Sequence, residues 1–419
     1  MRTKLPQWAQ KLLDRHPHAQ PPSVDDPMPT WLEGELSRIP LWAFIRGIDD
    51  VRHAHPYFLI EDVRSQPELM NGVLDLKSRL GDLAQRMVDR GTDHLIFTGC
   101  GSAFFNSIFG AFLFRDWTGL TTESWESLEF TNYWQPISRK AALIAQSATG
   151  GSIETLEAVR RARDDGLFTV ALTNTLRSPI GELCDETIAF STSQCCGPDI
   201  SVITTRLMMM YLLAVELGRR TGRLSHDRVE ALEQAIRALP EAAGRFLAEQ
   251  DRNVAKIAAT LHEQHALLLV GGGPNWFSAR EGALKVEEEC SLVCKAYRPA
   301  EYPHDAIALL SPHVTTVVIA PPGKSYQRLH DSLLTGQAAG SRGLALVQGG
   351  DETIARDADF VVSVPGELDE MLFPPLATIF FQLLGYYLGL ERNYNPDTLR
   401  TDNLDHARAW LTSFPFGTH

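Results

Sequence analysis

The chain has 419 residues, of which 44% are hydrophobic and 22% charged, and its formal net charge is −13. This length is too great for one hydrophobic core and predicts two domains of ordinary size with additional segments. The acidic balance argues against a nucleic-acid partner and an anionic membrane surface, and no stretch approaches the roughly 20 apolar residues that cross a bilayer. An anionic small ligand remains compatible with the composition, because a pocket can be locally rich in hydrogen-bond donors.

The N-terminus, MRTKLPQWAQKLLDRHP, lacks the apolar core and cleavage site of a secretory signal, so we expect a cytoplasmic protein. The six cysteines are too few and too scattered for a disulfide framework. Cys290 and Cys294 lie four residues apart on an expected helix, but no second Cys or His pair completes a zinc site. We expect buried free thiols, no metal and no cofactor.

Two Gly-rich loops each follow a short apolar strand, HLIFTGCGSAFFNS at 94–107 and HALLLVGGGPNWFS at 265–278. Further strands are predicted in step with them. In the first half they fall near 94–99, 141–146, 167–172 and 186–190, and their counterparts start near 265, 314, 342 and 359. The near-constant offset indicates a duplicated α/β unit, with a parallel sheet in each half and helices on both faces. Such folds bind small ligands at the carboxyl ends of their strands, where these loops lie.

The chain is expected to divide into five segments. Before the first unit we expect an arm and helices with a break at Gln66-Pro67, and the Pro-rich start is expected to lie on a neighbour or on the body. The expected segments are an N-terminal arm and helices (1–70), a first α/β unit (71–225), connecting helices (226–262), a second α/β unit (263–392) and a C-terminal tail (393–419).

A candidate anion-binding loop lies in ALIAQSATGGSIETLEAVRRA at 142–162, between an expected strand and an amphipathic helix. Ser147, Thr149 and Ser152 supply hydroxyls, and Gly150 lets the backbone approach a ligand closely. The helix start adds unpaired N–H groups and a favourable dipole, which together suit a phosphate. The alternative is that Ser152 simply caps the helix.

A second group of candidate residues lies in SAREGALKVEEECSLVCKAYRPAEYPHDAIALL at 278–310. Glu281, Lys285 and Glu288 are spaced so that they share one helix face. A carboxylate in a partly dry pocket has a raised pKa and can act as a base. The alternative is a solvated face with an ordinary Glu281–Lys285 pair, and His304 could equally be a surface turn residue.

The strand, S-x-T-G-G-S loop and helix resemble the sugar isomerase (SIS) family, whose S-x-S-G-x-T loop holds the phosphate of a phosphosugar. Ser147, Thr149, Gly150 and Ser152 match that loop. Cys100-Gly101-Ser102 matches the family's C-G-T turn, and GPDISVITTR, with Val202, resembles its G-T-E-x-x-V-x-S-T-K segment beside the sugar. The resemblance implies two tandem flavodoxin-like subdomains, with Gly101, Ser102 and Val202 joining the loop residues in substrate binding.

Two departures from the closest relatives remove polar partners from the expected anion-binding site. Ala103 stands where they usually carry a second hydroxyl, and Ala148 stands where they have Gln. The acidic group on the substrate is therefore expected to be a phosphate held by fewer bonds, with a sulfonate as the alternative.

The second segment closely resembles the isomerase domain of glucosamine-6-phosphate synthases over roughly residues 55–405. There the pattern is E-G-A-L-K-x-x-E, a Tyr and then E-x-x-H. The matching residues here are Glu281, Lys285, Glu288, Tyr297, Glu301 and His304. The resemblance implies that Glu288 shuttles the proton, that Lys285 and Glu281 shape its electrostatics, and that His304 opens the sugar ring of the adjoining subunit. A homodimer or higher homo-oligomer is therefore expected.

Two features of those synthases have no match here. No Cys nucleophile follows the initiator, so we expect no glutamine-derived ammonia, and no Lys follows Lys324, so imine catalysis is not expected. We expect an aldose–ketose isomerase that acts by enediol proton transfer on a C6-acidic hexose. The alternatives are an amino-sugar-phosphate deaminase, a fructosamine-6-phosphate deglycase or a non-catalytic sugar-phosphate sensor.

Overall fold

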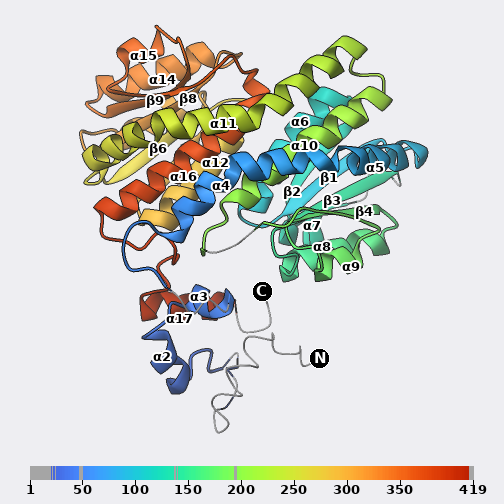
Figure 1. The fold of residues 1–419 in the computed structure, drawn as a ribbon, viewed down its shortest axis with the longest axis horizontal. Coiled ribbons are helices and arrows are strands. Elements are labelled where there is room, and N and C mark those ends of the chain that lie inside the picture. Colours follow the sequence, from blue (N-terminus) through green and yellow to red (C-terminus); the bar gives the residue numbers. More distant parts are fainter. Residues whose placement is uncertain are drawn as a thin grey trace.

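A computed structural model describes residues 20, 22–23, 25–46, 51–135, 138, 140–192 and 196–414. It contains two five-stranded parallel sheets with the same strand order (Figure 1). The first has the order β2-β1-β3-β4-β5 and the second β7-β6-β8-β9-β10. The strands are β1 (His94–Gly99), β2 (Thr121–Glu126), β3 (Ala141–Ser147), β4 (Phe168–Thr173), β5 (Glu186–Ala189), β6 (Ala266–Gly271), β7 (Val293–Tyr297), β8 (Val314–Ala320), β9 (Arg342–Gln348) and β10 (Phe360–Val364). This confirms the predicted tandem α/β class.

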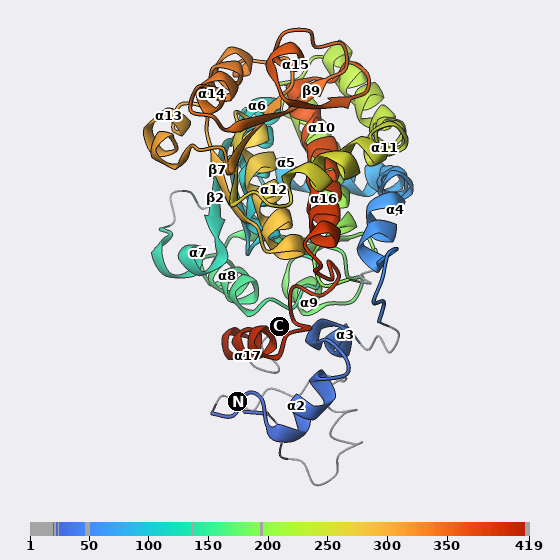
Figure 2. The ribbon, with the colours of Figure 1, turned by 90° about the vertical axis from the view of Figure 1, so that its left-hand side faces the viewer.

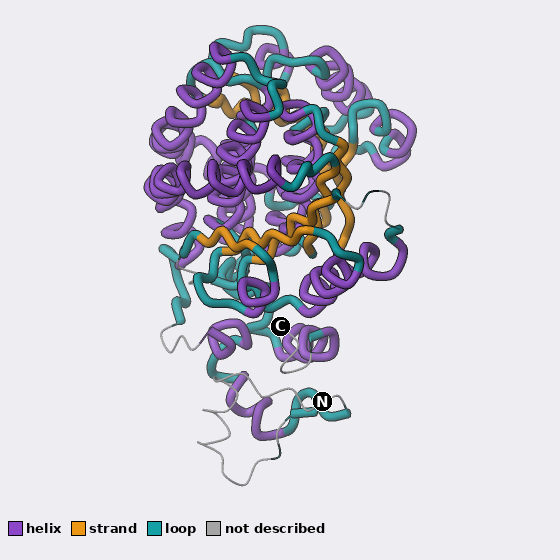
Figure 3. Tube along the Cα trace, turned by 90° about the vertical axis from the view of Figure 1, so that its right-hand side faces the viewer, coloured by secondary structure: helices purple, strands orange, loops and turns teal. Residues whose placement is uncertain are grey.

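Helices cover both faces of each sheet (Figures 1 and 3). Those of the N-terminal part and first repeat are α2 (Thr30–Leu36), α3 (Leu41–Arg46), α4 (Phe58–Val73), α5 (Lys77–Asp89), α6 (Ser102–Thr118), α7 (Ser127–Tyr133), α8 (Ile153–Asp164), α9 (Pro179–Leu183) and α10 (Ser201–Arg220). The others are α11 (His226–Leu261), α12 (Asn275–Cys290), α13 (Tyr302–Asp305), α14 (Tyr326–Ala338), α15 (Ile354–Asp357), α16 (Pro374–Glu391) and α17 (Leu404–Ser413).

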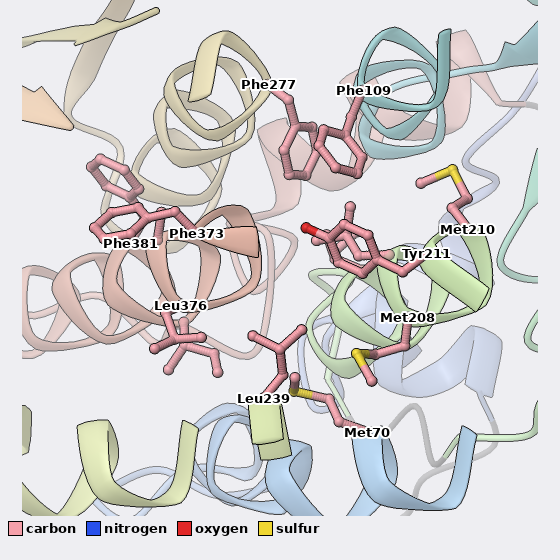
Figure 4. Packing of buried hydrophobic residues seen from close by; sticks show 14 of the residues in the cluster. Met70, Phe109, Met208, Met210, Tyr211, Leu239, Phe277, Phe373, Leu376 and Phe381 are labelled. Carbon is pink, nitrogen blue, oxygen red and sulfur yellow. The ribbon is translucent and has the colours of Figure 1, made fainter. Parts of the chain in front are cut away.

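Each sheet sends alternate side chains into different cores, as the two-residue period of a strand requires. In β1, Leu95 and Phe97 join the large central core, whereas Ile96 points into a separate core beneath α8. The inner faces of both sheets contribute to the central core, together with α4, α6, α10, α11, α12 and α16. Figure 4 shows Phe109 of α6 beside Phe277 of α12, with ring centroids 5.6 Å apart. The two repeats therefore share one core and form one body.

The edge strands β2 and β7 were not expected from the sequence. Strand β2 reads TTESWE and is at least partly exposed along its length, so it lacks the apolar run that marks a buried strand. Strand β7 begins where α12 was expected to continue. The helix instead ends at Cys290, because Ser291 turns into the left-handed region with φ 53°, and Cys294 lies on β7.

The expected break at Gln66-Pro67 is also wrong, because α4 continues through Pro67. A proline inside a helix leaves the carbonyl four residues earlier without its usual donor. Here the Gln66 side chain donates to that carbonyl, Val63 O, at 3.1 Å. Gln66 also donates to Gln382 Oε1 and accepts from Thr204 Oγ1, so tertiary hydrogen bonds hold this turn in place.

The chain ends form a small cap beside the body, made of α2, α3 and α17 (Figure 2). A hydrophobic cluster of its own holds these helices together, including Leu32, Leu36, Leu41, Phe44, Ala407 and Leu411. Residues 1–19 of the expected N-terminal arm lie outside the described part of the chain. Among the described helices, α10 alone has the length and apolar composition of a membrane span, but its most apolar window of 18 residues is buried, as is usual for a core helix.

Candidate active site

A pocket of about 880 Å³ lies at the carboxyl ends of the first sheet. Strands β1, β2 and β3 end at it, and residues of α12 and of the cap also line it. Its polar lining comprises Cys100, Gly101, Ser102, Glu126, Gln146, Ser147, Thr149, Gly151, Ser152, Glu154, Asp199, Glu288 and Thr401. This is where parallel α/β folds place their ligands.

The loop after β3, at residues 147–152, is the candidate anion-binding loop, and it is called the anion seat below. Gly150 adopts φ +70°, and its N–H donates to Ser147 Oγ at 3.0 Å. The N–H of Gly151 donates to Thr149 Oγ1 at 3.2 Å. A Cβ at Gly150 would collide with Ser178, so the tight loop requires glycine for its space as well as its backbone angle.

Ser152 does not cap α8. It occupies the N-cap position, but its side chain accepts no hydrogen bond from the helix, and its Oγ lies 3.4 Å from Ser147 Oγ. Gly101, at φ 55°, likewise precedes α6 without a side-chain cap. Two helix N-termini without a side-chain cap therefore border one pocket, which suits an anion and argues against the capping alternative.

The candidate catalytic residues lie on α12, which extends from the second repeat to this pocket. Lys285 Nζ lies 2.5 Å from Glu288 Oε2 and 3.6 Å from Glu281 Oε1, and it donates to Asp199 O at 3.0 Å. Ser102 Oγ donates to Glu281 Oε1 at 3.0 Å, which joins the α6 N-terminus to α12. Glu281 and Lys285 are completely buried, so the solvated-face alternative is wrong.

Burial and neighbouring charges shift the pKa values of Glu281, Lys285 and Glu288. Desolvation raises the pKa of Glu288, although Lys285 opposes the shift. Desolvation likewise raises the pKa of Glu281 to about 7, again against the pull of Lys285. Burial alone would lower the pKa of Lys285, but Glu288 and Glu281 outweigh it, so the pKa is raised and the ammonium stays charged. A carboxylate whose pKa moves toward neutrality, with one face open to the pocket, is suited to proton transfer.

The structure brings most of the predicted site residues together. Six line the pocket directly: Gly101, Ser102, Ser147, Thr149, Ser152 and Glu288. Glu281 and Lys285 lie behind Glu288, and Gly150 shapes the loop. Val202 is buried on α10, where its carbonyl accepts from Arg206 Nε at 3.0 Å, and it does not line the pocket. His304 is exposed on α13 and does not line it either.

Several lining residues were missed from the sequence. Glu126 ends β2, an edge strand that the pattern did not predict, and Glu154 lies in the first turn of α8. Asp199 belongs to the quoted GPDISVITTR segment and lies 3.7 Å from Arg206 Nη2, so the chemistry of that segment could have indicated it. The cap residues Trp42 and Trp410 carry no local signal, because their place depends on how the chain ends fold back.

The corresponding loop of the second repeat differs in the side chain that packs against its glycine. This loop, after β8, contains Gly323 in the place of Gly150, and the Glu370 carboxylate packs against Gly323 where Ser178 packs against Gly150. Among the described residues, no group of three or more His, Cys, Asp or Glu could hold a metal ion.

Comparison with known proteins identifies the first repeat. A model of the SIS domain matches residues 90–216, which contain β1 to β5 and the anion seat. This chain contains a SIS domain. It is 30% identical over 346 residues to the glutamine–fructose-6-phosphate aminotransferase (isomerizing) of Thermus thermophilus, a match that covers 80% of this chain and 56% of the relative. The SIS-domain protein thus spans little more than half the length of that curated relative.

Solved structures share the fold of both repeats. The C-terminal domain of glucosamine-fructose-6-phosphate aminotransferase from Francisella tularensis superposes with a TM-score of 0.73 at 18% identity, covering 83% of this chain and all of that one. Tagatose-6-phosphate ketose/aldose isomerase from Escherichia coli superposes with a TM-score of 0.70 at 17% identity, covering 83% and 96%. The SIS-domain protein therefore shares the two-repeat fold of these two structures.

Proposed function

We propose that this SIS-domain protein is an isomerase that transfers a proton between C1 and C2 of a hexose with an acidic group at C6. The observation that carries the proposal is that Glu288 and the anion seat open into the same pocket. The seat would hold the C6 phosphate, or a sulfonate, and Glu288 would face the other end of the sugar. The Thermus relative is named as isomerizing, which agrees with this chemistry.

The proposed reaction runs through an enediol. Glu288 removes the proton from C2 of the open-chain aldose, the electron pair forms the C1=C2 bond, and O1 gains a proton. Glu288 then returns its proton to C1 while O2 loses one, which gives the ketose. Lys285, 2.5 Å from Glu288 Oε2, stabilises the ionised carboxylate between these steps.

A panel of substrates tests the proposal. Purified protein in deuterated water is mixed with hexose 6-phosphates, amino-sugar phosphates, fructosamine phosphates and sulfosugars, and deuterium at C1 and C2 is followed by NMR. We expect incorporation with at least one C6-acidic sugar and none with the same sugar lacking the acid. A sensor would bind such a ligand without exchange, and this outcome would refute the enzymatic proposal.

A further inference from the structure

The proposed isomerisation moves two protons, and Glu288 accounts for only one of them. Glu288 carries the proton between C2 and C1, whereas O1 must gain a proton and O2 must lose one in the same turnover. Lys285 is not suited to this second transfer, because its ammonium already donates to Glu288 Oε2 at 2.5 Å and to Asp199 O at 3.0 Å. A second group that accepts and returns a proton must therefore face the pocket.

The wall of the pocket offers few groups of the right kind. Proton transfer near neutral pH uses the side chains of His, Asp, Glu, Lys, Tyr or Cys. Besides Glu288, the described lining residues of these types are Cys100, Glu126, Glu154 and Asp199. Burial raises the pKa of the Cys100 thiol to about 11, so this thiol is a poor proton carrier at neutral pH.

Two of the remaining carboxyl groups have other roles. Glu126 Oε2 accepts from the backbone N–H groups of Leu128 and Glu129 and so caps α7. Glu154 is in the first turn of α8, directly after the anion seat, so it lies beside the part of the pocket that would hold the C6 acid. Asp199 is the carboxyl group that remains.

Asp199 lies close to Glu288, and both residues contact the same cation. Lys285 Nζ is 2.5 Å from Glu288 Oε2 and donates to the backbone carbonyl of Asp199 at 3.0 Å. Burial raises the pKa of Glu288, and the negative charge of Asp199 adds to this rise, because the two carboxylates are within electrostatic reach of each other. One ammonium group therefore holds the base and a second carboxyl group together.

The side chain of Asp199 keeps its hydrogen-bonding capacity for a ligand. It is 30% exposed, and no residue in the described ranges donates a hydrogen bond to its carboxylate. Arg206 Nη2 lies 3.7 Å from Asp199 Oδ2, which offsets the charge but is too long for a hydrogen bond. The Arg206 side chain is completely buried, and its Nη1 and Nη2 have no hydrogen-bond partner in the described part of the chain. Both oxygens of Asp199 therefore have lone pairs available to a substrate.

We infer that Asp199 is the second catalytic acid–base of this site, which carries the hydroxyl proton from O2 to O1 while Glu288 carries the carbon-bound proton from C2 to C1. The inference rests on the proposed isomerase function and adds a catalytic residue to it. Lys285 and Arg206, which lie behind these carboxylates, would offset the charge of the pair.

The two transfers balance without a further co-reactant. Glu288 removes the proton from C2, the electron pair forms the C1=C2 bond, and negative charge develops on O1. Asp199 takes the proton of the O2 hydroxyl and gives it to O1, so the charge moves to O2 and the carboxylate is regenerated. The C2=O bond then forms, and the electron pair of the C1=C2 bond takes the proton from Glu288 at C1, which gives the ketose.

Deuterium exchange and sugar conversion report the two transfers separately. Exchange at C2 of the aldose in deuterated water requires only Glu288, whereas formation of the ketose also requires transfer from O2 to O1. With the aldose form of the substrate found in the panel, NMR follows both rates in Asp199→Asn protein. We expect conversion to fall by about 10²- to 10⁴-fold while exchange at C2 falls by less than about tenfold, so the ratio of exchange to conversion rises.

Asp199→Glu keeps a carboxylate and should restore the wild-type ratio, even where both rates are lower. Asp227→Asn is the matched control, because it makes the same chemical change at an exposed residue outside the pocket, and it should leave both rates unchanged. A parallel fall of exchange and conversion in Asp199→Asn, or conversion at the wild-type rate, would overturn the inference and leave Glu288 as the base. Absence of exchange by the wild type with every sugar would refute the proposed function, and the inference with it.

Discussion

Three consecutive glutamates of α12 show how position on a helix determines the chemistry of identical side chains. Glu287 is exposed and accepts from the backbone N–H of Cys294 at 3.1 Å. Glu288 faces the pocket and Lys285. Glu289 is buried against α16, where a Cβ at Gly385 would crowd it, and burial raises its pKa well above the usual value. Each residue turns the helix by about 100°, so only one of the three can reach the ligand.

The pH dependence of stability should report the burial of Glu281. Its pKa is raised to about 7, so the folded state holds this proton over a range in which the unfolded chain has lost it. The contribution to stability is therefore full below the unfolded pKa, near 4.5, and is lost as pH rises toward 7. Relative to Glu281→Gln, the free energy of unfolding of the wild type should fall by up to about 3 kcal/mol between pH 4.5 and 7.5. Urea unfolding at several pH values measures this, and parallel curves would contradict the assignment.

Among the elements, the loop between β3 and α8 is the most sensitive to backbone geometry. Gly150→Ala combines an unfavourable φ of +70° with a collision against Ser178 and Ile180. We expect a loss of affinity for the C6-acidic ligand of at least about tenfold, because the N–H groups of the loop can no longer converge. Titration calorimetry with the substrate found in the panel measures it.

Gly222→Ala provides the matched control for this loop. Gly222 has a similar φ of +73°, but a Cβ added there would meet no atom within 4 Å. The substitution should cost about 1 kcal/mol of stability and leave ligand affinity unchanged. If both variants bind as the wild type does, the loop is not the anion seat.

Elements with a strong local pattern were predictable, and those defined by distant contacts were not. The buried strands β1, β3 and β8 are continuous apolar runs before Gly-rich or Pro-rich loops, so the sequence locates them. Strand β2 is a half-exposed edge, and α4 survives its proline only because the side chain of Gln66 replaces the missing donor. The seat and the Glu281–Lys285–Glu288 cluster were predictable because their spacing is local.

On the scale of the whole molecule, the two repeats contribute different parts of the pocket. The pocket lies at the carboxyl ends of the first sheet, Glu370 packs against Gly323 in the second repeat, and α12 brings Glu288 from the second repeat to the pocket. The cap then adds apolar side chains to the pocket wall, among them Leu41, Trp42, Trp410 and Leu411. The sequence pattern could not predict this part of the wall, because it requires residues near 42 and near 410 to meet.

The predicted role of His304 can be tested by asking whether two subunits share an active site. The residue is exposed and outside the pocket of its own chain, so a role in ring opening requires a second copy of the protein. Glu288→Gln and His304→Ala subunits should each be inactive alone. When the two variants are co-expressed in equal amounts, the whole population of dimers should recover about a quarter of wild-type activity. Half of the dimers are then mixed, and each mixed dimer contains one complete site out of two. Co-expression and activity assays measure this. Recovery close to zero, with mixed dimers verified by mass spectrometry, would show that sites are not shared.

The most direct test of Glu288 as the base compares two neighbouring amides. With the substrate identified by the panel, Glu288→Gln and Glu287→Gln proteins are followed by NMR for deuterium incorporation at C1 and C2, and ligand affinity is measured in parallel. Glu287→Gln should exchange at the wild-type rate, because this side chain faces away from the pocket. Glu288→Gln should lose about 10²- to 10⁴-fold of the rate while retaining its affinity. Exchange by Glu288→Gln at the wild-type rate would contradict the proposed mechanism.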